Sequence, residues 1–191
     1  MRSSYEYMNY LLLVQVFVRT SRGLVSHVAR QVQQFAKQYS DDVEGLVLVE
    51  SVHAAQFERL GPLFPLPHLS EDARLADMQH FWTEGWKSPT STREKIDFRL
   101  SLGSPLGAGA LGDIPLRILT TGSFLRIPFL PPSVRANLQV AWIDLQKDFL
   151  ELSSDSVSTH WSSSSHFLQR DNPHAITAVV CDLISGKRMR K

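Results

Sequence analysis

Apolar residues along the chain form two kinds of pattern, short continuous runs and longer stripes with helical spacing. The runs are bounded by polar or turn-forming residues. Such runs are typical of strands that are buried on both faces of a parallel sheet. We therefore predict strands over Leu11–Val18, Gly45–Val49 and Ile114–Thr120, and a shorter strand over Val157–Trp161.

The first run, Tyr10–Val18, has about half the length that a bilayer-spanning helix needs. Gln15 interrupts it, and no small-residue cleavage site of a secretory signal follows it cleanly. A buried strand is therefore the favoured interpretation, and we predict no membrane span.

Three stretches carry apolar residues with the spacing of one helix face. The first begins at Leu24 and should end near Ser40–Asp42, and the second covers Val134–Leu152. The third begins at Asn172–Pro173, because Asn caps a helix and Pro fits its first turn. Gly186 is predicted to end this last helix. Strands and helices thus alternate, which indicates an α/β fold with a mostly parallel sheet flanked by helices.

Residues 54–110 lack a clear strand and lie between two predicted strands. Ser101–Gly112 is rich in glycine and is predicted to be a loop. Before it comes an aromatic-rich helix with Met78, Phe81, Trp82 and Trp86. Two interpretations stay open: a cap or lid that lines an apolar pocket, and ordinary packing of these aromatic side chains.

The composition fits one domain over residues 1–191, with 43% hydrophobic and 20% charged residues. The net charge of +1 gives no indication of nucleic-acid binding, and the basic stretch Lys187–Lys191 is interpreted as a solvated tail.

Cys181 is the only cysteine, so an intrachain disulfide is excluded, and its place in the last helix predicts a buried thiol. The histidines and this cysteine form no metal-ligand motif, so no metal or other cofactor is predicted. The compartment is not fixed by the sequence, although a cytoplasmic location is favoured.

Two ionisable residues stand where α/β proteins keep reactive groups. Glu50 comes directly after the predicted strand Gly45–Val49. His166 follows a run of four serines between a predicted strand and a predicted helix. The carboxyl ends of parallel strands meet at one edge of a sheet, so we expect the Glu50 carboxylate and the His166 imidazole to lie together.

The motif around this histidine resembles the carboxy-terminal end of the α/β-hydrolase family. It reads His-Phe-Leu-Gln-x-Asp-x-Pro from His166 to Pro173 and is followed by an amphipathic helix. The run Tyr39–His53 is also similar to the family's segment between the helix after the nucleophile and the next strand. The resemblance covers about residues 10 to 185, which corresponds to the carboxy-terminal two-thirds of a hydrolase. It implies that His166 is the general base and that Glu50, in place of the more usual Asp, is the acid of a catalytic triad.

The family's nucleophile stands on a Gly-x-Ser-x-Gly elbow, and that motif is absent from this sequence. Counting back from Phe35 by the family's spacing puts Ser26 at the nucleophile position. The elbow glycines are then replaced by Leu24, Val28 and Ala29. In the alternative alignment the elbow residues are missing, and Ser26 is an ordinary serine in the first turn of a helix.

Two functions follow from this resemblance. The first is a serine-type hydrolase of ester or related acyl substrates, with a small apolar acyl compound as its substrate. The second is a truncated hydrolase-like domain without catalytic activity that acts by association. A sheet that lacks its first strands would leave an apolar edge, which predicts self-association through that edge.

Overall fold

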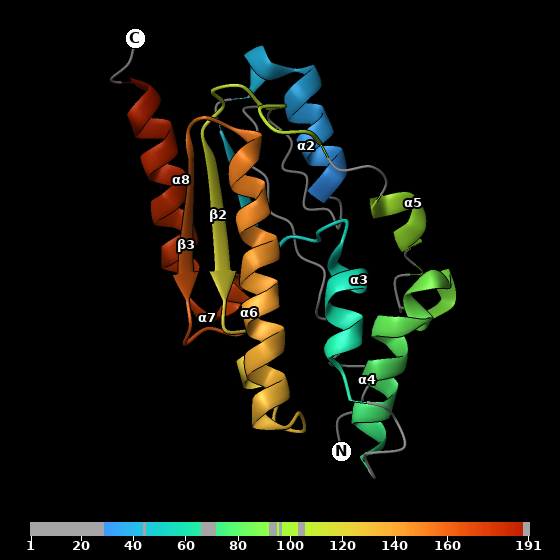
Figure 1. Cartoon of the computed structure of the whole chain (residues 1–191). Helices are drawn as coiled ribbons and strands as arrows, with labels where there is room; N and C mark the ends of the chain where they lie inside the picture. The colour runs from blue at the N-terminus through green and yellow to red at the C-terminus, as the bar shows by residue number, and fades with distance from the viewer. Residues whose placement is uncertain are drawn as a thin grey trace.

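A computed structural model describes residues 29–43, 45–65, 72–91, 95, 97–102 and 106–188 of the chain (Figure 1). The predicted strand Leu11–Val18 and the candidate nucleophile Ser26 lie outside these ranges. Of the first predicted helix, the part described is α2, Ala29–Gln38, which is followed by a 3-10 turn, η1, at Ser40–Asp42.

The core of the fold is a parallel sheet in the order β1-β2-β3, formed by Leu46–Val49, Leu116–Thr121 and Ser156–Trp161. Leu46 pairs with Leu116 at the start of β1, and Thr121 pairs with Trp161 at the end of β3. Two neighbouring parallel strands need a crossover connection, which brings the chain back to the end of the sheet where the first strand began. These crossovers are the helical region after β1 and α6, Pro132–Asp148, after β2. The three predicted strands that fall within the described ranges are thus confirmed.

Helices cover both faces of this sheet (Figure 1). Alternate residues of a strand point to opposite faces, and β1 shows this directly. Val47 and Val49 pack with Val180 and Leu183 of α8, Pro173–Arg188. Leu46 and Leu48 pack on the other face with Ala36 of α2 and with Phe149 and Leu152 of η7, the 3-10 turn Phe149–Leu152. The predicted α/β class, a parallel sheet flanked by helices, is confirmed for the described residues.

The region between β1 and β2 is helical. Its described part contains α3, Gln56–Leu60, α4, Ala73–Thr83, and α5, Phe98–Leu102. Three 3-10 turns accompany them: η2 at Gly61–Leu63, η4 at Gly85–Lys87 and η5 at Pro89–Ser91. Within the described part of this region there is no strand, as predicted.

The aromatic side chains of this region pack against helix α6. Phe81 and Trp82 of α4 are buried in one apolar cluster with Leu138 and Trp142 of α6. This packing supports the second interpretation of these aromatic residues. A role of the region as a cap or lid stays a prediction.

Two expectations for the last helix were wrong. Cys181 is exposed, because the face of α8 that packs on the sheet is formed by Ile176, Val180 and Leu183. Consecutive residues of a helix point in different directions around its axis. Cys181, which follows Val180, therefore points away from the face that packs on the sheet. Gly186 does not end the helix, which continues to Arg188. A glycine inside a helix lowers its stability by about 1 kcal/mol relative to alanine, but it breaks no hydrogen bond.

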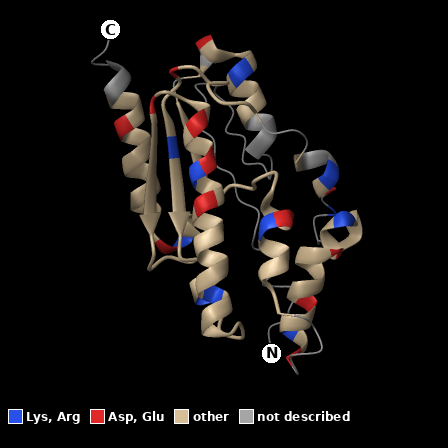
Figure 2. Ribbon diagram, viewed as in Figure 1, with Lys and Arg blue, Asp and Glu red and all other residues tan. Residues whose placement is uncertain are grey.

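The charged residues are mixed over the described elements (Figure 2). Along α6, for example, Lys147 forms an ion pair with Asp144, and the neighbouring Asp148 forms an ion pair with Arg59 of α3. None of the helices in the described part combines the length and the apolar character that a bilayer-spanning segment requires.

Candidate functional site

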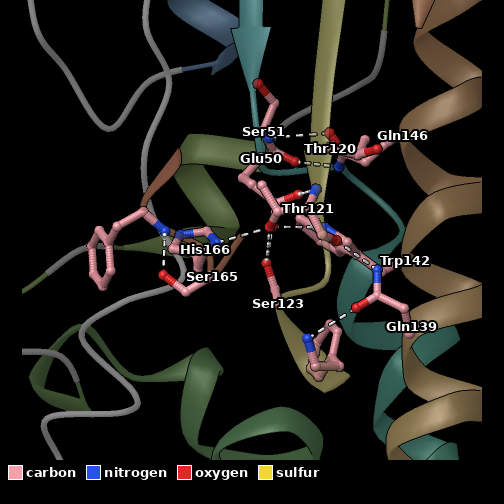
Figure 3. A network of polar contacts seen from close by, with 12 residues as sticks. Glu50, Ser51, Thr120, Thr121, Ser123, Gln139, Trp142, Gln146, Ser165 and His166 are labelled. Carbon is pink, nitrogen blue, oxygen red and sulfur yellow. Dashed lines mark hydrogen bonds and ion pairs between the residues drawn. The ribbon is translucent and has the colours of Figure 1, made fainter. Parts of the chain in front are cut away.

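The carboxyl ends of the three strands lie at one edge of the sheet, and polar residues follow each of them (Figures 1 and 3). Glu50 follows β1, the turn Gly122–Ser123 follows β2, and the loop with His166 follows β3. Since the strands are parallel, these three segments meet. We treat this meeting point as the candidate active site.

Glu50 has an unusual backbone conformation. Its φ angle is +48°, in the left-handed region that residues with a side chain rarely adopt. Its N–H donates to the carbonyl oxygen of Leu119 at 2.9 Å, which ties the end of β1 to β2. Such a conformation costs about 1–3 kcal/mol and persists where the surroundings hold it, as they do at many active sites.

The Glu50 carboxylate is fully buried, with 0% of the residue exposed, and it accepts from four groups (Figure 3). The backbone N–H of Thr121 donates to Oε1 at 2.6 Å. The hydroxyl of Ser123 and the indole N–H of Trp142, at 3.1 Å, donate to Oε2. His166 Nδ1 lies 3.2 Å from the same Oε2. An ionised carboxylate is an acceptor only, and burial of its charge requires such donors.

His166 has its second ring nitrogen unused. The residue is 6% exposed, and Phe167 contacts its ring in an edge arrangement, with ring centroids 5.5 Å apart. Because the Glu50 carboxylate accepts at Nδ1, we assign the ring proton to Nδ1. Nε2 then carries the lone pair, and this buried atom has no hydrogen-bond partner within the part of the chain that the structure describes. An imidazole held in this way can take up a proton at Nε2.

The loop that carries His166 is fixed at several points. Asp171 accepts from the N–H of Ser165 at 2.5 Å, and Arg126 donates to the carbonyl oxygen of Ser163. The hydrogen bonding from Ser165, followed by the nearby Arg126 and Arg170, holds the pKa of the Asp171 carboxyl below its usual value. The backbone that bears the imidazole is thus held by short hydrogen bonds on both sides of Ser164.

Two buried glutamines of α6 hold the ends of β1 and β2. Gln139 donates to the carbonyl oxygen of Thr121 at 2.8 Å and accepts from the N–H of Phe124 at 3.0 Å. Gln146 donates to the carbonyl oxygen of Ser51 at 2.6 Å and accepts from its N–H at 3.1 Å. These glutamines, and likewise Thr121, Ser123 and Trp142, were not predicted from the sequence as site residues. Glutamines that lie seven residues apart on the apolar face of a helix were a signal for the first two.

Two of the three candidate catalytic residues are therefore in contact. The structure brings Glu50 and His166 together from opposite ends of the described chain, as the sequence predicted, while Ser26 lies outside the described residues. No group of three or more His, Cys, Asp and Glu side chains within the described ranges is arranged to hold a metal ion. Comparisons of the chain with models of protein families, with curated proteins and with solved structures found no match.

Proposed function

We propose that the chain has the architecture of the carboxy-terminal part of an α/β-hydrolase and that it hydrolyses ester or related acyl substrates. The observation that carries the proposal is the contact of the Glu50 carboxylate with His166 Nδ1, while the buried Nε2 has no hydrogen-bond partner among the described residues. The order of three parallel strands, with the acid after β1 and the base after β3, supports the same assignment.

In this mechanism His166 Nε2 takes the proton of a hydroxyl nucleophile as that oxygen attacks the acyl carbon. The resulting imidazolium donates from Nδ1 to the Glu50 carboxylate, whose negative charge stabilises it. The same Nε2 proton then passes to the leaving alcohol, and a water molecule repeats the sequence to release the acid. Ser26 is the candidate nucleophile by alignment with the family.

The second candidate function is that of a hydrolase-like domain without turnover. The specific observation in its favour is the absence of a Gly-x-Ser-x-Gly elbow from the sequence. Side chains at the elbow glycines would crowd the neighbouring strand and helix. In this case the Glu50–His166 pair is a structural hydrogen bond that ties the end of β3 to the end of β1.

Hydrolysis of p-nitrophenyl acetate and p-nitrophenyl butyrate distinguishes the two functions. We expect a His166→Ala variant to lose about a hundredfold or more of kcat/KM, because a general base contributes about 10²–10⁴-fold. A His174→Ala variant is the matched control, since His174 is exposed on the first turn of α8. Equal rates in the wild type and the His166→Ala variant exclude the proposed mechanism, and a wild type without hydrolysis supports the second function.

A further inference from the structure

The Glu50 oxygen that faces His166 is also held by two donors with no place in the proposed chemistry. The indole N–H of Trp142 and the hydroxyl of Ser123 both donate to Oε2. We propose that Trp142 and Ser123 are positioning residues, which hold the Glu50 carboxylate in the orientation that selects the Nδ1-protonated form of His166. The inference deepens the proposed function and rests on it for the catalytic role of the pair.

The first support is the burial of Trp142. The residue is 0% exposed and lies in the apolar cluster between α6 and the helical region, where it contacts the ring of Phe124 with centroids 6.1 Å apart. A side chain in this position is shielded from any substrate. Its indole N–H therefore acts on the reaction only through Glu50.

The second support is the fixed position of α6. Gln139, Trp142 and Gln146 have the spacing i, i+3 and i+7, which places them on one face of the helix. The two glutamine amides hold the backbone at the ends of β2 and β1, as described above. The indole N–H lies between these two attachment points, so the helix fixes its position relative to the backbone of Glu50.

The third support is the length of the Glu50 side chain. Glutamate has one more methylene group and one more rotatable bond than aspartate, so its carboxylate has more orientations to choose from. The donors from Trp142 and Ser123 both meet Oε2, while the N–H of Thr121 meets Oε1. Together they leave the carboxylate one orientation, in which Oε2 faces the imidazole.

Three variants test this inference. Trp142→Phe removes the indole N–H and keeps an aromatic ring in the cluster, and Ser123→Ala removes the hydroxyl. Trp82→Phe is the matched control, because Trp82 is buried in the same cluster at 1% exposure and its Nε1 has no hydrogen-bond partner in the described part of the chain. The same change of side chain therefore removes a donor to Glu50 in one variant and no hydrogen bond in the other.

The first measurement is the tautomer of His166, read from the ¹⁵N chemical shifts of its ring nitrogens and assigned with a His166→Ala variant. We expect a single Nδ1-protonated form in the wild type and in Trp82→Phe, and a mixture of both tautomers in Trp142→Phe and Ser123→Ala. The second measurement is ester hydrolysis, where kcat should fall by about tenfold or more in both variants while KM changes little, because a hydrogen bond to a charged group is lost.

A single Nδ1-protonated form and an unchanged kcat in both variants would overturn the inference. A residue that served only stability would lower the folded fraction and leave the tautomer of the folded molecules unchanged. If Trp142→Phe does not fold, the Ser123→Ala variant decides by the same measurements. If the wild type shows no hydrolysis that depends on His166, the proposed function fails, and the tautomer measurement still decides whether these residues position the pair.

Discussion

Nδ1 of His166 lies 3.2 Å from Oε2 of Glu50, although 116 positions separate the two residues in the chain. The contact crosses over the end of β2, which lies between β1 and β3 in the sheet. The order and the parallel direction of the strands therefore create the pair. Helix α6 contributes through the backbone contacts of its buried glutamines, which fix the ends of β1 and β2.

A Glu50→Gln variant should be less stable by about 2–4 kcal/mol, measured by urea unfolding. The amide nitrogen of the new side chain must face one of the N–H or O–H groups that now donate to the carboxylate, so buried donors lose their acceptor. Glu58→Gln on the exposed surface of α3 is the control and should change stability by less than about 0.5 kcal/mol. An equal effect of the two substitutions would show that the donors around Glu50 are not energetically significant.

A Gly122→Ala variant should lose stability and displace the His166 loop. A Cβ atom at Gly122 would lie 2.2 Å from the carbonyl oxygen of Ser162, which is backbone and has little room to move. We expect a loss of about 1–3 kcal/mol by thermal or urea unfolding. Gly107→Ala is the control, because a Cβ atom there meets no atom of the described residues within 4 Å. A Gly122→Ala variant as stable as Gly107→Ala would contradict the close approach of the two loops.

His53 predicts a pH dependence of stability. Burial lowers the pKa of its imidazole, which the nearby Asp148 opposes and Arg59 reinforces. Its Nδ1 accepts from the N–H of Ala55 at 3.1 Å, so the neutral ring holds the turn that leads into α3.

The unfolded chain, with an ordinary histidine pKa of about 6.5, binds a proton more readily than the folded chain. Stability from this residue is therefore complete above about pH 6.5 and is lost as the pH falls through the lowered folded-state pKa. A His53→Asn variant keeps an acceptor for Ala55 and cannot titrate. The free energy of unfolding should decline less in this variant than in the wild type between pH 7.5 and 5. Parallel declines would rule out the contribution of His53.

The three strands of the described sheet and the main helices could be predicted because their apolar patterns are local. Continuous apolar runs such as Leu46–Val49 indicate a strand that is buried on both faces. The stripe of apolar residues over α6 indicates a helix with one buried face. The prediction that Glu50 and His166 meet required only that the strands before them be parallel. The exposure of Cys181 was missed because a stripe of apolar residues along a helix includes residues at its sides, which can face solvent, as well as the residues at its centre, which are buried.

The remaining site residues depend on contacts that a single pattern does not contain. Trp142 counted as an apolar position of α6, and its N–H was assigned no acceptor. Ser123 stands in a turn after β2, where a polar residue is ordinary. Their convergence on one oxygen of Glu50 is set by the tertiary structure, since each comes from a different segment.

The central claim is that His166 Nε2 activates a hydroxyl nucleophile, and covalent labelling with a fluorophosphonate tests it most directly. The account predicts one adduct per chain by intact mass spectrometry, located on Ser26 by peptide mapping. The labelling rate should fall by about a hundredfold or more in the His166→Ala variant. A wild-type chain that forms no adduct, or one that is labelled as fast without His166 as with it, would contradict the account.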